Sequence, residues 1–255
     1  MAKITFLGVG NAFTMADWQS NLLVEADDGA KLLLDCGSDI RWSLAELGYG
    51  AADIAAVYLS HVHADHIGGM EWLAYNSYFN PSLSKPALFF SRDIEENLRE
   101  CLEPSLSPIK DAGEVVLDTF FRVKPTLKKF RWRGILFELV ATEHVPAVGD
   151  GLGKMSYGLK ISRKGGKKVF WTSDTLYNPL RHSSRYPWAD IILQGCELGF
   201  ATGVHAHISE LSTLPAQVRE KMLLYHYNHD AVSQHADELS QFQHGLARKG
   251  MEIPF

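Results

Sequence analysis

Short apolar runs punctuated by glycine, asparagine and aspartate open the chain and predict a series of β-strands. The strands expected there lie at 4–7, 21–26 and 31–34. Asp28-Gly29, between the last two, is a dipeptide typical of tight hairpin turns. A helix is expected at 40–47, ended by Gly48, and 55–59 predicts a further strand that leads into a polar segment.

A similar order, strands first and then a helix and a strand, returns in the second half of the chain. The expected strands lie at 131–141, 156–162, 168–172, 191–193 and 223–225, and a helix is expected at 214–222. Lys164-Gly165-Gly166-Lys167 predicts the turn between the second and third of these strands. Two halves of this kind favour two sheets packed face to face with helices outside.

The region 72–129 is the least regular part of the pattern. It contains five prolines and a dense set of aromatic residues, and a helix is expected only at 94–101. We interpret most of these aromatics as core or interface packing and the others as the lining of a substrate pocket. We therefore expect one domain over 1–255 in which 72–129 is an irregular, aromatic-rich insertion. The insertion also offers a surface for a homodimer.

Size and composition fit an enzyme-sized globular protein. The chain has 255 residues, of which 46% are hydrophobic and 22% are charged, enough to bury one sizeable core. Its formal net charge of -5 argues against a broad electrostatic attraction to nucleic acid. We interpret the basic residues between 124 and 133 as a solvated face.

The start of the chain and the cysteines indicate a compartment. No charged segment followed by a long apolar run precedes the first expected strand, and no run approaches the roughly 20 apolar residues that cross a bilayer. Cys36, Cys101 and Cys196 are an odd number without CxxC spacing, which argues against a disulfide framework. We expect a cytoplasmic protein without a membrane partner.

The segment after the strand at 55–59 is the strongest chemical signal in the chain. Four residues with metal-binding side chains fall within six positions there: His61, His63, Asp65 and His66. Histidines two apart on an extended segment can point the same way, and the Asp-His pair would begin the next helix, so two adjacent ions can be bound. The alternative, a set of individually hydrogen-bonded surface histidines, is disfavoured because such neighbours are costly to hold together without a cation. Gly68 and Gly69 are expected to let the backbone turn tightly beside the site.

The pattern HxHxDH at 61–66 resembles the signature of the metallo-β-lactamase fold. Phe6-Leu7-Gly8-Val9-Gly10-Asn11-Ala12-Phe13 is similar to the opening strand and glycine turn of the branch that contains ribonuclease Z and cyclic-nucleotide phosphodiesterases. Leu34-Asp35-Cys36-Gly37 resembles the DxG motif of that branch. The resemblance covers nearly the whole chain and implies an α/β (α+β) protein, an αββα sandwich with two metal ions at one edge of the sheets.

The same resemblance implies the remaining metal ligands. His144 would serve the first ion, Asp174 would bridge both ions, and His226 would serve the second. The first set is then His61, His63, His144 and Asp174, and the second set is Asp65, His66, Asp174 and His226. His229 competes with His226, but the order of a strand followed directly by a histidine favours His226.

Such a pair of sites predicts hydrolytic chemistry. Two cations roughly 3.5 to 4 Å apart can hold a bridging hydroxide and neutralise charge on a phosphoryl or acyl oxygen. Two divalent ions are therefore expected as cofactors. Nitrogen and carboxylate ligands favour zinc, with manganese and iron as alternatives. Asp65 is expected to act in catalysis as well as in metal binding.

The proton for the leaving oxygen has two candidate sources. In the ribonuclease Z branch a His-x-Ser/Thr segment assists the leaving alkoxide, and His207-Ile208-Ser209 fits that pattern, with His205 as the alternative. The branch also tends to place an acidic residue after a strand like 189–193, where it orients the catalytic histidine. Glu197 is the nearest candidate, although Gly195 stands where the acid is first expected.

The expected substrate is a small phosphodiester. The motifs resemble the phosphodiesterase branch more than the thioesterase or glyoxalase branches, and the sequence lacks the long Gly-rich, basic arm with which ribonuclease Z enzymes grip tRNA. A cyclic nucleotide is favoured, as in cyclic AMP phosphodiesterases, phage enzymes that destroy cyclic pyrimidine nucleotide signals, or the cyclic phosphodiesterase of phosphonate breakdown. The alternatives are a ribonuclease Z-like RNA endonuclease, an iron-binding redox protein resembling the pyrroloquinoline quinone biosynthesis factor, and a metal-stabilised scaffold without activity.

Overall fold

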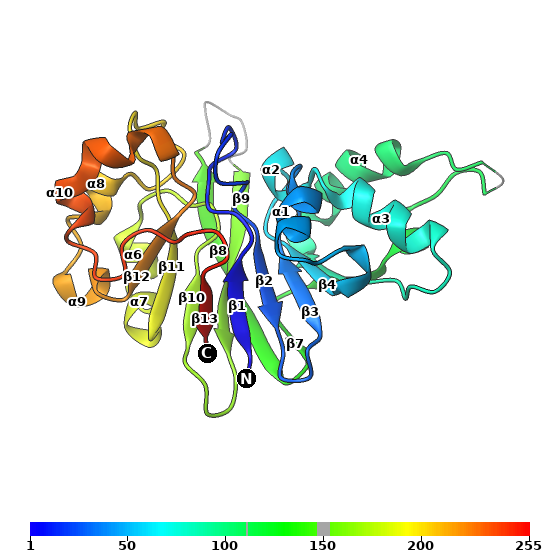
Figure 1. The fold of residues 1–255 in the computed structure, drawn as a ribbon, viewed down its shortest axis with the longest axis horizontal. Helices are drawn as coiled ribbons and strands as arrows, with labels where there is room; N and C mark the ends of the chain where they lie inside the picture. The colour runs from blue at the N-terminus through cyan, green and yellow to red at the C-terminus, as the bar shows by residue number, and fades with distance from the viewer. Residues whose placement is uncertain (111, 147–153) are drawn as a thin grey trace.

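Two mixed sheets form the centre of the fold in the computed structural model, which describes residues 1–110, 112–146 and 154–255 (Figure 1). The first sheet has the order β13 (Glu252–Pro254), β1 (Lys3–Phe6), β2 (Leu22–Glu25), β3 (Lys31–Leu34), β4 (Ile54–Leu59), β5 (Ala87–Ser91), β6 (Arg122–Thr126). The second has the order β12 (Met222–Tyr225), β11 (Ile191–Gly195), β10 (Val169–Trp171), β9 (Lys154–Ser162), β8 (Ile135–Val145), β7 (Lys129–Trp132). Each sheet combines an antiparallel part with a parallel part, β3 to β6 in the first and β10 to β12 in the second.

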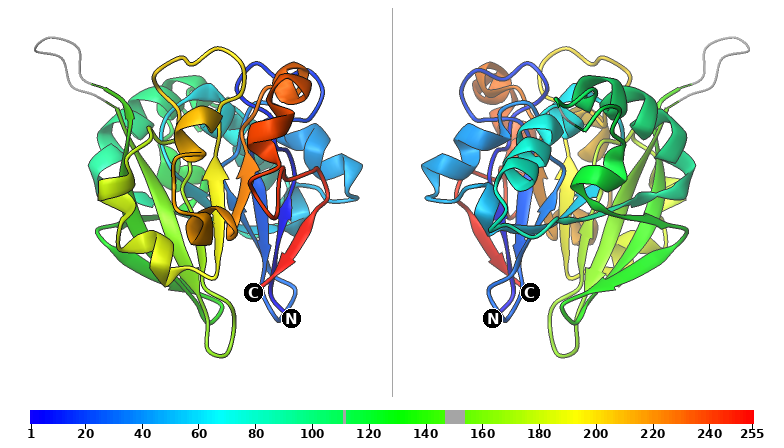
Figure 2. Two further views of the ribbon diagram at one scale, coloured as in Figure 1. Left: turned by 90° about the vertical axis from the view of Figure 1, so that its left-hand side faces the viewer. Right: turned by 90° about the vertical axis from the view of Figure 1, so that its right-hand side faces the viewer.

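Helices cover the outer faces of the sheets, as Figures 1 and 2 show. Beside the first sheet are α1 (Ile40–Glu46), α2 (Ala64–Ile67), α3 (Met70–Phe79), α4 (Glu95–Leu106) and α5 (Leu117–Phe120). Beside the second are α6 (Pro179–His182), α7 (Arg185–Trp188), α8 (Ile208–Leu211), α9 (Ala216–Arg219) and α10 (Ala236–Leu239). Short 3-10 helices lie at Ala51–Asp53, Arg92–Ile94 and His229–His235. Among the residues described, no helix combines the length and the apolar character needed to cross a membrane. The layers are those of the expected αββα sandwich.

Large aromatic side chains join the two sheets in the core. Tyr58 on β4 meets Trp171 on β10 edge-on, with ring centroids 6.2 Å apart, and Phe89 on β5 stacks on Phe130 on β7 at 4.1 Å. All four are buried. Such pairs contribute about 0.5 to 1.5 kcal/mol beyond the burial of their area, so they hold the sheets in one relative position.

The ends of the parallel strands define the functional edge of the sandwich. β4 ends at Leu59, β10 at Trp171 and β12 at Tyr225, and each is followed within three residues by a predicted metal ligand. These ligands lie in common clusters, so the carboxyl ends of strands from both sheets meet at one edge. The sheets bring together residues that are far apart in the sequence.

Two predicted elements differ from the structure. The single strand expected at 131–141 is the hairpin of β7 and β8, in which Arg133 and Gly134 form the turn with φ of 47° and 79°. This backbone conformation matches the two-residue turns that join twisted strands. The helix expected at 214–222 is reduced to α9, because Met222 already pairs with Ile192 as the first residue of β12.

The expectation that 72–129 is irregular is wrong. The region contains most of α3 and the whole of α4 and α5, and its strands β5 and β6 extend the first sheet. Pro125 is tolerated on β6 because β6 is the edge strand and, within the described part of the chain, one of its sides has no ladder partner. Several aromatics of the region are buried, as core packing requires: Phe89, Phe90, Phe120 and Phe121. The prolines are thus spread over α4, which contains Pro104, the edge strand β6, and the segments that join the elements.

Candidate metal centre

The HxHxDH segment crosses from a strand into a helix. The chain leaves β4 at Leu59 and stays extended through His61 to His63, the N-cap of α2, where φ is -80° and ψ is 153°. Asp65 and His66 then lie in the first turn of α2 and are buried. The extended part and the helical turn therefore each contribute two potential ligands.

His144 reaches the cluster through a β-bulge. The pairing of β8 with β9 shifts register between Glu143 and Val145, which leaves His144 as the extra residue. Bulges of this kind re-aim a side chain. The Nδ1–H of His144 donates to the carbonyl oxygen of Val204 at 2.8 Å, so the lone pair of Nε2 remains free on the side of His63.

Strained backbone places the ligands that follow β10 and β12. Ser173, directly before Asp174, has φ of 52°, and His226 has φ of 65°. Such conformations cost on the order of 1 to 3 kcal/mol for a residue with a side chain and cluster at functional sites. The backbone N–H of His226 donates to the carbonyl of Val9 at 2.7 Å, which holds this residue in place.

The seven predicted ligands form two sets that share one carboxylate. The ligand atoms of each set lie within 4.8 Å of one another: His61, His63, His144 and Asp174 in the first, and Asp65, His66, Asp174 and His226 in the second. Oδ2 of Asp174 lies 3.1 Å from Nε2 of His66 and 3.6 Å from Nε2 of His144. His229 is outside both sets, since its ring contacts Asp17 at 2.6 Å and is 59% exposed.

The polar atoms of the cluster fit a cation. Nδ1 of His63 lies 3.1 Å from Nε2 of His61 and 3.1 Å from Nε2 of His144, and no arrangement with a proton on that one nitrogen serves both contacts fully. Among the described residues, Oδ1 of Asp174 is buried without a hydrogen-bond partner. Converging lone pairs and an orphaned carboxylate oxygen are what a metal ion would satisfy.

Burial keeps most of the ring nitrogens free of protons. It lowers the pKa of His61, of His63 to about 4, and of His144, so that these rings are neutral and able to ligate at pH 7. For Asp174 burial acts in the opposite direction, but the neighbouring histidines, His226 first, outweigh it and hold the pKa of the carboxyl well below its usual value. In the second set burial lowers the pKa of His66 and of His226, but the neighbouring carboxylates outweigh it and raise both above the usual value, so metal binding there would release protons from these rings.

Asp35 anchors the second set from behind. Its Oδ2 lies 2.7 Å from Nδ1 of His66, and its two oxygens also accept from the backbone N–H and the hydroxyl of Ser60 at 2.8 Å. A carboxylate on one histidine nitrogen fixes the tautomer and aims the other nitrogen at a metal. The sequence placed Asp35 in a DxG motif without assigning this role. The signal available was an aspartate immediately after an apolar strand.

Glycines near the cluster are needed for close approach rather than for a tight turn. Gly68 and Gly69 form the expected turn between α2 and α3, but their φ of -63° and -91° can be adopted by any residue, so the turn itself does not require glycine. A Cβ on Gly68 would lie 2.4 Å from the hydroxyl of Ser38, and one on Gly69 would lie 2.4 Å from the carbonyl of Gly37. Because glycine has no side chain, α2 and α3 can pack closely against the segment after β3.

His205 is the additional histidine that borders the cluster. Its Nδ1 lies 3.9 Å from Oδ2 of Asp174, and its ring centroid is 4.8 Å from that of His144 and 4.6 Å from that of His226. The side chain keeps 17% of its surface exposed, so it faces both the ligands and solvent. Burial lowers the pKa of His205 to about 3. Its ring is therefore neutral at pH 7 in this state.

His207 has a different position, as the N-cap of α8. Its Nδ1 accepts from the backbone N–H of Ser209 at 3.3 Å, and its Nε2 lies 3.0 Å from the carbonyl of Gly199. Both ring nitrogens thus have partners that hold the start of a helix. Of the two histidines named as proton donors, the geometry favours His205.

Glu197 does not orient either histidine. Its Oε2 accepts from the backbone N–H of Thr202 at 2.7 Å, and in the described part of the chain its carboxylate forms no hydrogen bond with His205 or His207. The backbone of Glu197, and not its carboxylate, pairs with His207 in an isolated β-bridge. Glu197 instead forms part of a cavity wall beside the cluster.

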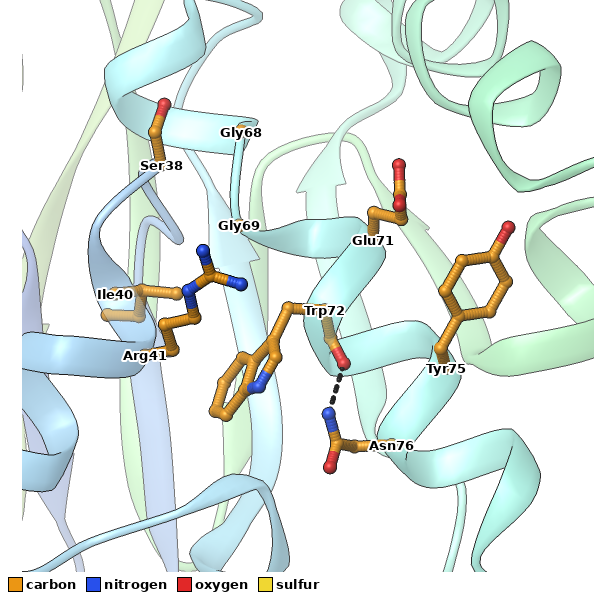
Figure 3. A pocket seen from close by; sticks show the side chains of 9 residues that line it. All are labelled: Ser38, Ile40, Arg41, Gly68, Gly69, Glu71, Trp72, Tyr75 and Asn76. Carbon is orange, nitrogen blue, oxygen red and sulfur yellow. Dashed lines mark hydrogen bonds between the residues drawn. The ribbon is translucent and has the colours of Figure 1, made fainter.

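Two cavities lie near the HxHxDH segment. One, of about 440 Å³ including its open mouth, is bordered by His205 and His226 together with Asn11, Phe13, Glu197 and Thr202. The other, of about 700 Å³, lies between α1 and α3 and includes Arg41, Trp72 and Tyr75 (Figure 3). No metal-cluster residue lines the second cavity. Of these two cavities, the first includes a predicted ligand, His226.

Comparison with known sequences shows the family. A family model described as anti-Pycsar protein Apyc1 matches residues 2–252. The chain belongs to this family. A protein of Bacillus phage vB_BveM-Goe7 with that name is 30% identical over 267 residues, covering 98% of this chain and 97% of the phage protein. A Paenibacillus harenae protein with the same name is 32% identical over 241 residues, covering 91% and 92%.

Comparison with solved structures shows how this Apyc1-family chain is folded. A diphosphatase of the PhnP family superposes with a TM-score of 0.76 at 18% identity, covering all of this chain and 98% of the other. The metallo-β-lactamase fold protein YhfI from Bacillus subtilis superposes with a TM-score of 0.72 at 20% identity, covering 100% and 99%. The predicted αββα sandwich of the metallo-β-lactamase fold is thus confirmed.

Proposed function

We propose that the chain is a metal-dependent phosphodiesterase that opens a small cyclic nucleotide by hydrolysis. The observation that carries this proposal is the sharing of Asp174 between two complete ligand sets, with its second oxygen buried and unpaired among the described residues. The sets would hold two divalent cations, and their nitrogen and carboxylate donors suit zinc first, then manganese or iron. Bound there, the ions would lower the pKa of a water molecule and neutralise charge on the phosphoryl oxygens.

The chain's own residues would position the phosphodiester and handle the leaving group. His205 lies at the boundary between the ligands and the 440 Å³ cavity, so its ring can contact an ester oxygen of a substrate held there. A ring N–H donated to that oxygen stabilises the charge that develops as the P–O bond breaks. Asp65 remains a ligand in this scheme. Its carboxylate lies 3.4 Å from Nε2 of His226, and this contact keeps these two members of the second set in place.

The substrate class rests on the size of the cavity and on resemblance. Without its open mouth the cavity measures about 130 Å³, which is space for part of a small molecule and not for a folded RNA. The net charge of -5 gives no broad field for a polynucleotide. The relatives are named anti-Pycsar proteins, and the sequence motifs resemble the cyclic-nucleotide phosphodiesterase branch, which includes phage enzymes acting on cyclic pyrimidine nucleotides.

The proposed setting is the cytoplasm. Cys36, Cys101 and Cys196 are all free thiols, and burial raises the pKa of Cys36 and Cys196 above the usual value. Buried, protonated thiols behave as small apolar side chains and need no oxidising compartment.

The test is turnover with bis-p-nitrophenyl phosphate and a panel of 3′,5′-cyclic nucleotides, together with metal analysis. His205→Ala is expected to lower kcat by about a hundredfold or more with the metal content unchanged, and His207→Ala by much less. Arg41→Ala, in the cavity of Figure 3, is the matched control and should leave turnover unchanged. A protein that binds two ions but hydrolyses none of these phosphodiesters, or that carries stable iron without such activity, would overturn the proposal.

A further inference from the structure

We propose that Phe13 is the residue that stacks on the nucleobase and so determines preference for nucleotides over simpler phosphodiesters. This inference rests on the proposed function, since it assigns a substrate group to the cavity beside the metal ligands. Phe13 lies on the loop between β1 and β2 and borders the same cavity as His205 and His226. A phosphodiester at the ligands would therefore have its attached group beside the phenyl ring.

Phe13 is exposed in an unusual setting. Its side chain is 87% exposed, although burying a phenylalanine is worth about 1.5 to 3 kcal/mol. Single exposed apolar residues are common on protein surfaces. Here the exposed ring borders a cavity that also includes the predicted ligand His226 and its neighbour His205, and a flat face next to a reaction site suits a flat ligand.

The loop holds Phe13 through hydrogen bonds on both sides. Oδ1 of Asn11 accepts from the backbone N–H of Phe13 at 3.0 Å, and the carbonyl of Asn11 accepts from Thr14 at 3.1 Å. The backbone N–H of Asn11 donates to the carbonyl of Tyr227 at 3.3 Å, the residue directly after His226. The backbone that carries Phe13 is thus tied to the segment of a metal ligand, which reduces the loop ordering that stacking requires.

The lining of the cavity also supplies polar groups. Glu197 and Thr202 are part of it, and the backbone N–H of Thr202 donates to the carboxylate of Glu197 at 2.7 Å. An aromatic ring and oxygen atoms in one lining match a nucleoside, which has a flat base and N–H and O–H groups at its edges. A simple alkyl phosphodiester would use neither feature.

Met15 provides a matched control on the same loop. Its side chain is fully exposed, but it borders a separate apolar cavity formed with Trp18 and Trp42 rather than the cavity at the ligands. Phe13 borders both cavities, so the two substitutions separate them. If the base occupied the apolar cavity, Met15→Ala would weaken nucleotide hydrolysis.

The experiment compares metal-loaded wild type, Phe13→Ala, Phe13→Tyr and Met15→Ala on 3′,5′-cyclic CMP and on glycerol 1,3-cyclic phosphate, which has the same six-membered phosphodiester ring without a base. Phe13→Ala should lower kcat/KM for the nucleotide by about 5- to 150-fold, mainly through KM, and leave the glycerol ester unchanged. Phe13→Tyr should retain nucleotide activity, and Met15→Ala should match wild type on both substrates. Equal losses on both substrates, no loss for Phe13→Ala, or a nucleotide-selective loss for Met15→Ala would overturn the assignment.

Calorimetric binding of cyclic CMP separates this assignment from the proposed function. Weaker binding by Phe13→Ala than by wild type, with no turnover of either substrate, would support stacking and refute hydrolysis. Ring opening of glycerol 1,3-cyclic phosphate without any binding of cyclic CMP would support hydrolysis and refute stacking.

Discussion

Replacement of Asp35 by asparagine should release one of the two metal ions and spare the other. One oxygen of Asp35 accepts from the backbone N–H of Ser60, so the asparagine carbonyl must take that position and its NH₂ group must face Nδ1 of His66. That nitrogen would then have to accept, and the ring proton would move to Nε2. Nε2 is the atom that faces Asp174 at 3.1 Å, so its lone pair would be lost to the metal.

The magnitude follows from the loss of an outer hydrogen bond to a ligand, which typically weakens metal binding about 10- to 100-fold, or roughly 1.4 to 2.7 kcal/mol. Only the second set contains His66, so only one ion should be affected. The assay is elemental analysis after dialysis against graded chelator, with circular dichroism as a check on folding.

Asp39→Asn is the matched control, because the same chemical change occurs where the carboxylate accepts from the backbone N–H of Gln19 and, among the described residues, forms no hydrogen bond with a ligand. Retention of both ions by Asp35→Asn at wild-type affinity would refute the reasoning. Equal loss of both ions would also refute it, because the change would not be specific to the set of His66.

Three further predictions address the bridging ligand, the core and the pH dependence of stability. Asp174→Ala should remove both ions in the same metal analysis, and loss of one ion alone would contradict the shared ligand. Tyr225→Phe should change the free energy of unfolding by less than about 1 kcal/mol in urea titrations, because the buried hydroxyl has no partner among the described residues; a larger loss would reveal one. Burial lowers the pKa of His182 from 6.5 to about 4, so its contribution to stability is present above pH 6.5 and lost as the pH falls toward 4; His182→Leu should flatten this dependence, and an unchanged pH profile of urea unfolding would contradict it.

The local sequence pattern was sufficient to predict strands and helices where residues typical of turns separate them. The strands at the start of the chain, the Asp28-Gly29 turn and α1 lie within about two residues of their predicted positions. The region 72–129 could not be read in this way. Its strands β5 and β6 are recognisable only as additions to an existing sheet, since their prolines and aromatics give no clear alternation.

The candidate site also has a part that the local sequence predicts and a part that depends on the fold. His61 to His66 could be recognised from the sequence because a strand and a helical turn place four neighbouring side chains together by local geometry. The distant ligands followed from family resemblance, and the fold places them beside that segment. The role of Asp35 was missed because its partner, His66, is 31 positions away and meets it only across two paired strands.

The sequence by itself determined which chemical groups are available, which of them follow strands, and that the chain resembles a metal-binding superfamily. Tertiary structure alone decided which of His205 and His207 lies beside the ligands. These residues are two positions apart just before α8. His205 lies beside Asp174, whereas His207 caps the helix. Spacing cannot distinguish two such side chains, because their environments are set by strands and loops that only the folded chain brings near.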